Sequence, residues 1–145
     1  MTYIPEALRR TVLARAKNCC EYCLIPQESK LFTFELDHII AEKHRGATRE
    51  DNLCLSCLDC NRAKGSDFAS FDPQTEAVAF LFNPRRDQWY EHFQLHAAVI
   101  QPLTAQGRVT VFLANLNEER RVSERVALIE AERYPPPEFQ VWLPI

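Results

Sequence analysis

The chain lacks the features that would place it in or across a membrane. No apolar run approaches the roughly 18 residues that a membrane-spanning helix needs. The start of the chain has no basic stretch followed by an apolar one, as a secretory signal peptide has. We therefore expect a cytoplasmic protein with no membrane partner. Repeats, linkers and low-complexity tracts are also missing, and 145 residues with 46% hydrophobic content predict a single globular domain over 1–145.

An excess of positive charge is missing as well, since the formal net charge is −3. Non-specific affinity for nucleic acid comes mostly from Lys and Arg that neutralise phosphates, so this charge argues against a protein that coats nucleic acid. The charge is uneven. Residues 1–65 hold ten basic and nine acidic side chains, whereas 66–145 hold seven and eleven. The first part is the less acidic one, and bound divalent cations would make it more positive.

Cysteine, by contrast, is plentiful and regularly spaced. Two C-x2-C pairs are separated by 33 residues, and together they offer four thiolates from Cys20, Cys23, Cys57 and Cys60. The two-residue gap lets both sulfurs of a pair reach one ion, and four thiolates suit a tetrahedral Zn²⁺ ion. This spacing, in a chain without an export signal, favours metal ligands over disulfides. We predict a structural zinc site.

Two further cysteines leave the register of the second pair open. Cys54 and Cys57 also form a C-x2-C pair, and Cys19 adjoins Cys20. The asparagine that follows Cys60 favours the pair Cys57 and Cys60. We expect Cys19 and Cys54 to be small packing residues.

Oxygen and nitrogen groups lie between and beside the pairs, although a saturated four-cysteine site does not need them. Asp37 and Asn61 can hold one hard cation, Mg²⁺ or Mn²⁺, through oxygen atoms. His38 is a natural general base for phosphodiester hydrolysis, because its unperturbed pKa lies near neutrality. The competing interpretation of His38 is a partly buried histidine with satisfied hydrogen bonds.

These residues carry a resemblance to a known family. The run Cys20–Gly65 contains Cys-x2-Cys, Asp-His-Ile-Ile, Asn-Leu and Cys-x2-Cys-Asn-x2-Lys-Gly in that order. It resembles the zinc-containing branch of the HNH endonucleases, whose core is a ββα-metal finger, and weaker similarity to small bacterial stand-alone members extends to about residue 130. The resemblance implies DNA as the partner and cleavage that leaves 5′-phosphate and 3′-hydroxyl ends. It also implies that Asn52 braces the loop joining the two strands and so orients His38.

The residue pattern predicts an α+β fold. The finger should occupy 14–70, with a helix before it, and an extension of short antiparallel strands and helices should occupy 71–134. We expect helices over 5–17, from 57 to 65, over 104–116 and after Ser123 until the proline run 135–137; strands over 31–36, 52–56, 77–82, 88–95 and 99–103; and a polar loop over 41–51.

Charged side chains outside the metal sites divide into candidate DNA contacts and surface positions. Lys64 and Arg62 lie within one turn of Asn61, so we expect them to contact DNA phosphates, Lys64 in particular. We expect four further arginines to lie at the solvated surface: Arg85, Arg86, Arg120 and Arg121.

The resulting hypothesis is a metal-dependent DNA endonuclease. One alternative is a noncatalytic zinc-finger module that binds nucleic acid or a protein, and another is a structural zinc ribbon inside a larger assembly. The combination of Asp37, His38, Asn52 and Asn61 favours the enzyme, because a binding module does not need all four. Oligomeric state, cleavage preference and the identity of the catalytic cation stay open.

Overall fold

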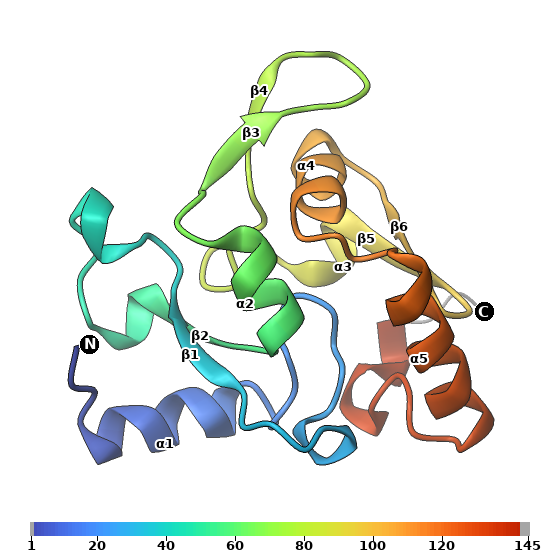
Figure 1. The fold of residues 1–145 in the computed structure, drawn as a ribbon, viewed down its shortest axis with the longest axis horizontal. Coiled ribbons are helices and arrows are strands. Elements are labelled where there is room, and N and C mark those ends of the chain that lie inside the picture. Colours follow the sequence, from blue (N-terminus) through green and yellow to red (C-terminus); the bar gives the residue numbers. More distant parts are fainter. Residues whose placement is uncertain (1, 143–145) are drawn as a thin grey trace.

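A computed structural model describes residues 2–142 (Figure 1). The N-terminal finger and the C-terminal elements share one hydrophobic core. The fold is α+β, as predicted. The core runs from Val12 in the first helix, through Leu53 and Leu55 between the cysteine pairs, to Leu128 and Tyr134 near the end of the described chain.

The first helix, α1, spans Glu6–Arg15 and confirms the expected N-terminal helix. Pro5 precedes it, and the acidic Glu6 and basic Arg15 lie at the ends where the helix dipole favours their charges. Val12 is fully buried, and the Arg15 guanidinium donates a hydrogen bond to the Leu53 carbonyl at 2.8 Å. The helix is thereby fixed against the second strand of the finger.

The finger has the predicted order of strand, strand and helix. Strand β1 (Glu35–His38) pairs antiparallel with β2 (Leu53–Ser56), with Asp37 opposite Cys54. Helix α2 (Leu58–Lys64) follows at once and ends at Gly65, whose φ of 53° suits glycine.

The expected strand over 31–36 is wrong in its first four residues. Leu31 and Phe32 are exposed rather than half-buried. The side chain of Gln27 donates to the Phe32 carbonyl at 2.9 Å and accepts from the Phe34 amide at 2.6 Å. These backbone groups are therefore engaged by a side chain before a strand partner can reach them.

The extension contains two separate hairpins instead of one small sheet. Strands β3 (Ala69–Phe71) and β4 (Val78–Phe80) form the first, and β5 (Phe93–His96) and β6 (Val99–Pro102) form the second. The strand expected over 88–95 is wrong in its first half, because Trp89–His92 is the one-turn helix α3.

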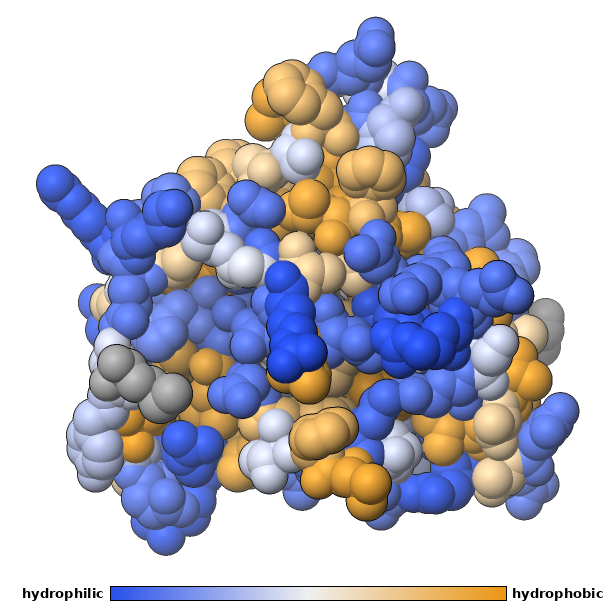
Figure 2. All heavy atoms as spheres, viewed as in Figure 1, coloured by the Kyte–Doolittle hydropathy of each residue, from blue (hydrophilic) through white to orange (hydrophobic). Residues whose placement is uncertain are grey.

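The first hairpin presents an apolar face to solvent. Its register places Phe71 opposite Val78 and Ala69 opposite Phe80, so these side chains share a face. Phe71, Val78 and Phe80 are each about two-thirds exposed. Figure 2 shows apolar residues gathered over this part of the molecule.

Two helices complete the extension. Helix α4 (Ala105–Leu113) begins where predicted, with the Thr104 hydroxyl accepting a hydrogen bond from the Gly107 amide at 3.0 Å. Helix α5 (Glu119–Glu130) begins before Ser123, which is not its cap; Glu118 precedes it, and the acidic Glu119 suits its first turn.

Short 3-10 turns cover Gln27–Ser29, Glu42–His44, Glu50–Asn52 and Pro137–Trp142. Among the described helices, none has both the length and the apolar character needed to cross a bilayer.

The buried hydroxyl of Thr110 gives a stability test of the extension. Thr110 Oγ accepts from the Phe82 amide at 2.8 Å and donates to the Gln106 carbonyl at 2.7 Å. Thr110→Val keeps the shape but leaves the buried amide unpaired, so we expect the free energy of unfolding to fall by about 1–3 kcal/mol in urea titrations. The control is Thr11→Val on the exposed face of α1, which should change it by less than about 0.5 kcal/mol. If Thr110→Val and Thr11→Val lowered the free energy of unfolding equally, the buried hydrogen bonds of Thr110 would not be the cause of its effect.

Candidate functional site

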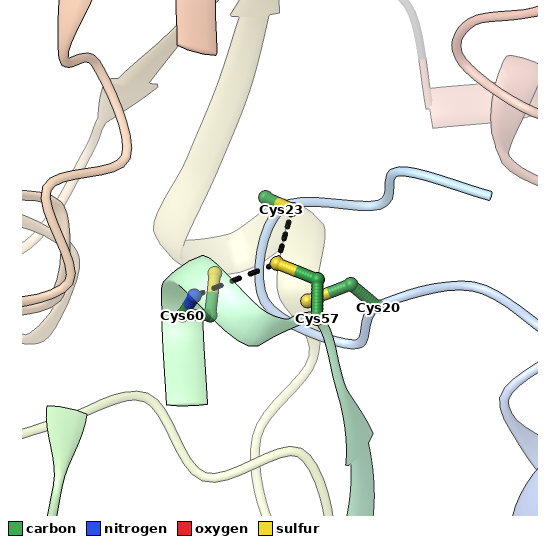
Figure 3. Close-up of side chains that lie close together, drawn as sticks. All are labelled: Cys20, Cys23, Cys57 and Cys60. Carbon is green, nitrogen blue, oxygen red and sulfur yellow. Dashed lines mark hydrogen bonds between the residues drawn. The ribbon is translucent and has the colours of Figure 1, made fainter. Parts of the chain in front are cut away.

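Four cysteine side chains form a buried cluster between the segment that follows α1 and the start of α2 (Figure 3). The sulfur atoms of Cys20, Cys23, Cys57 and Cys60 all lie within 4.8 Å of one another. The Sγ atoms of Cys23 and Cys57 are 3.8 Å apart. A tetrahedral zinc ion with Zn–S bonds of about 2.3 Å holds its sulfur ligands about 3.8 Å apart, so the cluster fits Zn²⁺.

Residues distant in sequence hold the first cysteine pair in place. The Tyr22 carbonyl accepts a hydrogen bond from the Trp89 indole at 2.9 Å, and the Cys23 carbonyl accepts one from the Tyr134 hydroxyl at 2.7 Å. The extension thus fixes the backbone of the segment that carries Cys20 and Cys23. The second pair is fixed by α2 itself, because Cys57 caps the helix and Cys60 lies in its first turn.

The other two cysteines lie outside the cluster, as expected. Cys54 Sγ contacts the Tyr22 hydroxyl at 3.5 Å and Asp37 Oδ2 at 4.0 Å. Cys19 Sγ donates to the Lys17 carbonyl at 3.3 Å. Burial raises the pKa of Cys54 and raises that of Cys19 to about 12, so both stay neutral thiols at ordinary pH. The register of the second pair is therefore Cys57 and Cys60.

Asp37 lies near the end of β1 and is 8% exposed. Its Oδ2 atom is 3.1 Å from the Lys64 ammonium and 3.4 Å from the Tyr22 hydroxyl. Burial raises the pKa of Asp37, while the Lys64 charge and hydrogen bond act in the opposite direction. Lys64, expected at a DNA phosphate, is buried here as the counterion of Asp37, whereas Arg62 on the same helix is exposed.

The imidazole of His38 is held by the loop that follows β1. Nε2 lies 2.9 Å from the Thr48 hydroxyl and 3.8 Å from a Glu42 carboxylate oxygen. Lys64 also donates to the His38 carbonyl at 3.3 Å. Sequence reasoning missed Thr48 and Glu42, because a polar residue in a loop gives no sign of which way its side chain points.

Asn52 ties together the two ends of that loop. Its amide oxygen accepts from the Ile40 amide at 2.9 Å, and its Nδ2 donates to the carbonyls of Ile40 at 3.0 Å and Ala47 at 2.9 Å. Gly46 packs against the same place, since a Cβ there would lie 1.6 Å from the Ile40 oxygen. Only glycine fits this close approach.

Asn61 directly follows Cys60. It lies three residues before Lys64, so the side chains of Asn61 and Lys64 share a face of α2. Asp37 and Asn61 offer carboxylate and amide oxygens, which suit a hard divalent cation. Tyr22, Cys54 and Lys64 all contact the Asp37 carboxylate through Oδ2, so Oδ1 is the oxygen that could face a cation. The donor chemistry fits Mg²⁺ or Mn²⁺.

Two arginines expected at the solvated surface are shielded from solvent: Arg121 is buried and Arg85 is partly buried. The Arg121 side chain is 4% exposed, with Nη2 at 2.9 Å from Cys60 Sγ. Arg85 forms an ion pair with Glu21, and its side chain is 9% exposed. Sequence patterning placed both outside because it could not show the packing of the extension on the finger. Arg86 and Arg120 are exposed, as predicted.

The site therefore defines a class: a ββα finger built around four clustered cysteines that fit a metal ion, with adjacent Asp and His residues near the end of β1. Residues 20–67 match the model of the HNH endonuclease family. The chain thus contains an HNH endonuclease domain, and its cysteine cluster is consistent with the zinc-containing branch. An HNH domain implies a nuclease or nucleic-acid-binding function. No curated protein and no solved structure matches the chain.

The metal centre can be tested by comparing cysteines inside and outside the cluster. Cys60→Ser should abolish folding, because three thiolates and a hydroxyl bind Zn²⁺ poorly and we expect the fold to require the metal. Cys54→Ala removes a buried thiol outside the cluster and should keep one zinc per chain. Zinc content by elemental analysis and circular dichroism report the two results. A Cys60→Ser protein with native dichroism and full zinc content would sink the assignment.

Proposed function

We propose that this protein is a metal-dependent DNA endonuclease in which His38 activates water for phosphodiester hydrolysis. The observation that carries the proposal is the HNH finger itself, which holds Asp37 and His38 side by side on β1 and packs that strand against α2. The catalytic roles of Asp37, His38, Asn52 and Asn61 and the DNA substrate belong to the proposal.

The loop contacts suit His38 to the role of a base. When Nε2–H donates to the Thr48 hydroxyl, Nδ1 carries the lone pair and can take a proton from water. The Asn52 clamp keeps the loop, and with it Thr48, at the right distance from the ring. Asn52 therefore acts on the base by positioning it.

Asp37 and Asn61 would hold the catalytic cation. When bound, Mg²⁺ or Mn²⁺ supplies Lewis-acid stabilisation of charge on the phosphoryl oxygens and the departing 3′ oxygen. The protein's part is to present the two oxygen donors at fixed positions. β1 carries one donor and α2 the other, and the cysteine cluster fixes the start of α2. Lys64 keeps the buried Asp37 charge paired and so favours its ionised form.

One observation favours a second candidate, a noncatalytic zinc-finger module that binds nucleic acid. The Asp37 charge is already balanced by Lys64 at 3.1 Å, and a binding module needs nothing more of this carboxylate. The exposed Arg62 could then contact a phosphate without any cleavage. Cleavage and binding assays distinguish the two candidates.

The test of the nuclease is cleavage of supercoiled plasmid at low salt with added Mg²⁺ or Mn²⁺. We expect His38→Ala to lower the rate by about 10²- to 10⁴-fold, the range supplied by a general base. Thr48→Val should lower it less, because the ring loses a positioning contact but keeps its lone pair. Both variants should keep their zinc.

Three results would count against this assignment. Equal activity of wild type and His38→Ala would mean that another residue or a contaminant cleaves the DNA. No cleavage by wild type, with retardation of DNA in a gel, would establish the binding module instead. If the wild-type protein neither cleaves DNA nor retards it in a gel, nucleic acid is excluded as its partner.

The ion pair between Asp37 and Lys64 gives a prediction that does not depend on cleavage. Both side chains are less than 10% exposed, so Lys64→Met leaves a buried carboxylate unpaired and should cost about 3–5 kcal/mol in urea denaturation. The double change Asp37→Asn with Lys64→Met should recover most of this loss. Added Mg²⁺ should stabilise the single variant but not the double one, because only the single variant keeps the carboxylate for the cation.

The matched control is Arg62→Met on the exposed part of α2, which should change stability by less than about 0.5 kcal/mol. If Mg²⁺ stabilises the single and double variants equally, the cation does not bind at Asp37.

A further inference from the structure

Helix α5 lies against the cysteine cluster through several polar side chains. Arg120 pairs at 2.8 Å with Asp59, which lies between Cys57 and Cys60 in the sequence. Glu124, one turn further along α5, pairs with Lys30 at 2.5 Å. These ion pairs place one face of α5 on the finger, although its sequence lies about 60 residues beyond the second cysteine pair.

Arg121 on this face is fixed at both ends of its guanidinium. Nη1 donates to the carbonyls of Ala114 at 2.7 Å and Asn115 at 3.0 Å, where α4 ends. Nη2 points to the cluster, at 2.9 Å from Cys60 Sγ and 3.9 Å from Cys57 Sγ. The carbonyls therefore hold the guanidinium so that its other donor faces sulfur.

The charges explain why a buried cation is stable there. A zinc ion with four thiolates carries two net negative charges, and burying them without a counterion is costly. Arg121 contacts the sulfurs directly, whereas the nearest carboxylate, Asp59, is 3.9 Å from its Nε and already paired with Arg120. Charge-assisted N–H···S hydrogen bonds thus connect the two buried charges.

We infer that Arg121 is a positioning residue for the zinc site, which stabilises the metal-bound thiolates of Cys57 and Cys60 and makes metal retention depend on the docking of α5. The inference goes beyond the proposed nuclease activity, and it stands or falls with the zinc centre alone. Groups around a metal's direct ligands commonly set its affinity, and their loss costs about 10- to 100-fold.

The same helix supplies a matched control. Arg125 is also buried, but its guanidinium donates to the carbonyls of Ala98 and Leu116 and to the Asn117 side chain, and no contact with the cluster is recorded for it in the described chain. Arg125→Met therefore removes a buried guanidinium without removing a hydrogen bond to sulfur. The Arg125→Met variant therefore measures how much zinc affinity is lost when a buried guanidinium is removed for structural reasons alone.

The experiment compares full-length wild type, Arg121→Met and Arg125→Met. Competition with a chromogenic chelator should show a zinc dissociation constant about 10- to 100-fold higher for Arg121→Met than for wild type. In the cobalt-substituted proteins, the thiolate-to-metal charge-transfer bands should move to lower energy for Arg121→Met only, because its thiolates lose a hydrogen bond. A structural defect elsewhere in α5 would not move these bands.

Charge-transfer bands of Arg121→Met that coincide with those of wild type would overturn the inference. So would an equal loss of zinc affinity in the two variants. Should Arg121→Met not fold, Arg121→Lys keeps the charge but loses the two-ended geometry of the guanidinium. Its bands must then differ from those of wild type, and unshifted bands would again overturn the inference.

Discussion

The structure depends on one constraint, the convergence of two cysteine pairs that are 33 residues apart in sequence. Bringing these pairs to one point closes a loop that consists mainly of β1, β2 and their connection. The closed loop places β1 against α2, and there the Asp37 carboxylate meets Lys64. A metal bound by the four buried cysteines would therefore also set the distance between the strand and the helix that carry the candidate active site.

The sequence predicted the parts of the fold whose signals are local. Ligand spacing identified the cysteine cluster, and Thr104 marked the start of α4. The strand over 31–36 was misplaced because the side chain of Gln27, not a neighbouring strand, takes the backbone groups of that segment. Alternating hydrophobicity could not reveal this competition, since the pattern of Phe32 and Phe34 is the same in both cases.

In the candidate site, too, the sequence predicted what a local motif encodes and missed what tertiary packing decides. Neighbouring residues such as Asp37 and His38 follow from the motif, but their partners are set by tertiary packing. Lys64 at a helix end suggests a solvent-facing charge, whereas low exposure makes pairing with Asp37 obligatory. Arg121 gave no sequence signal of a contact with sulfur, because the cluster lies 61 residues earlier in the chain.

The contacts of Tyr134 with the first cysteine pair and of Arg121 with the second have a consequence for protein synthesis. A chain terminated prematurely before α5 keeps all four cysteines, Trp89 and α2, but it lacks Arg121 and Tyr134. Such a fragment would emerge from the ribosome with its ligands present and their surroundings incomplete. The contacts around the cysteine cluster are therefore complete only after α5 and Tyr134 have been synthesised.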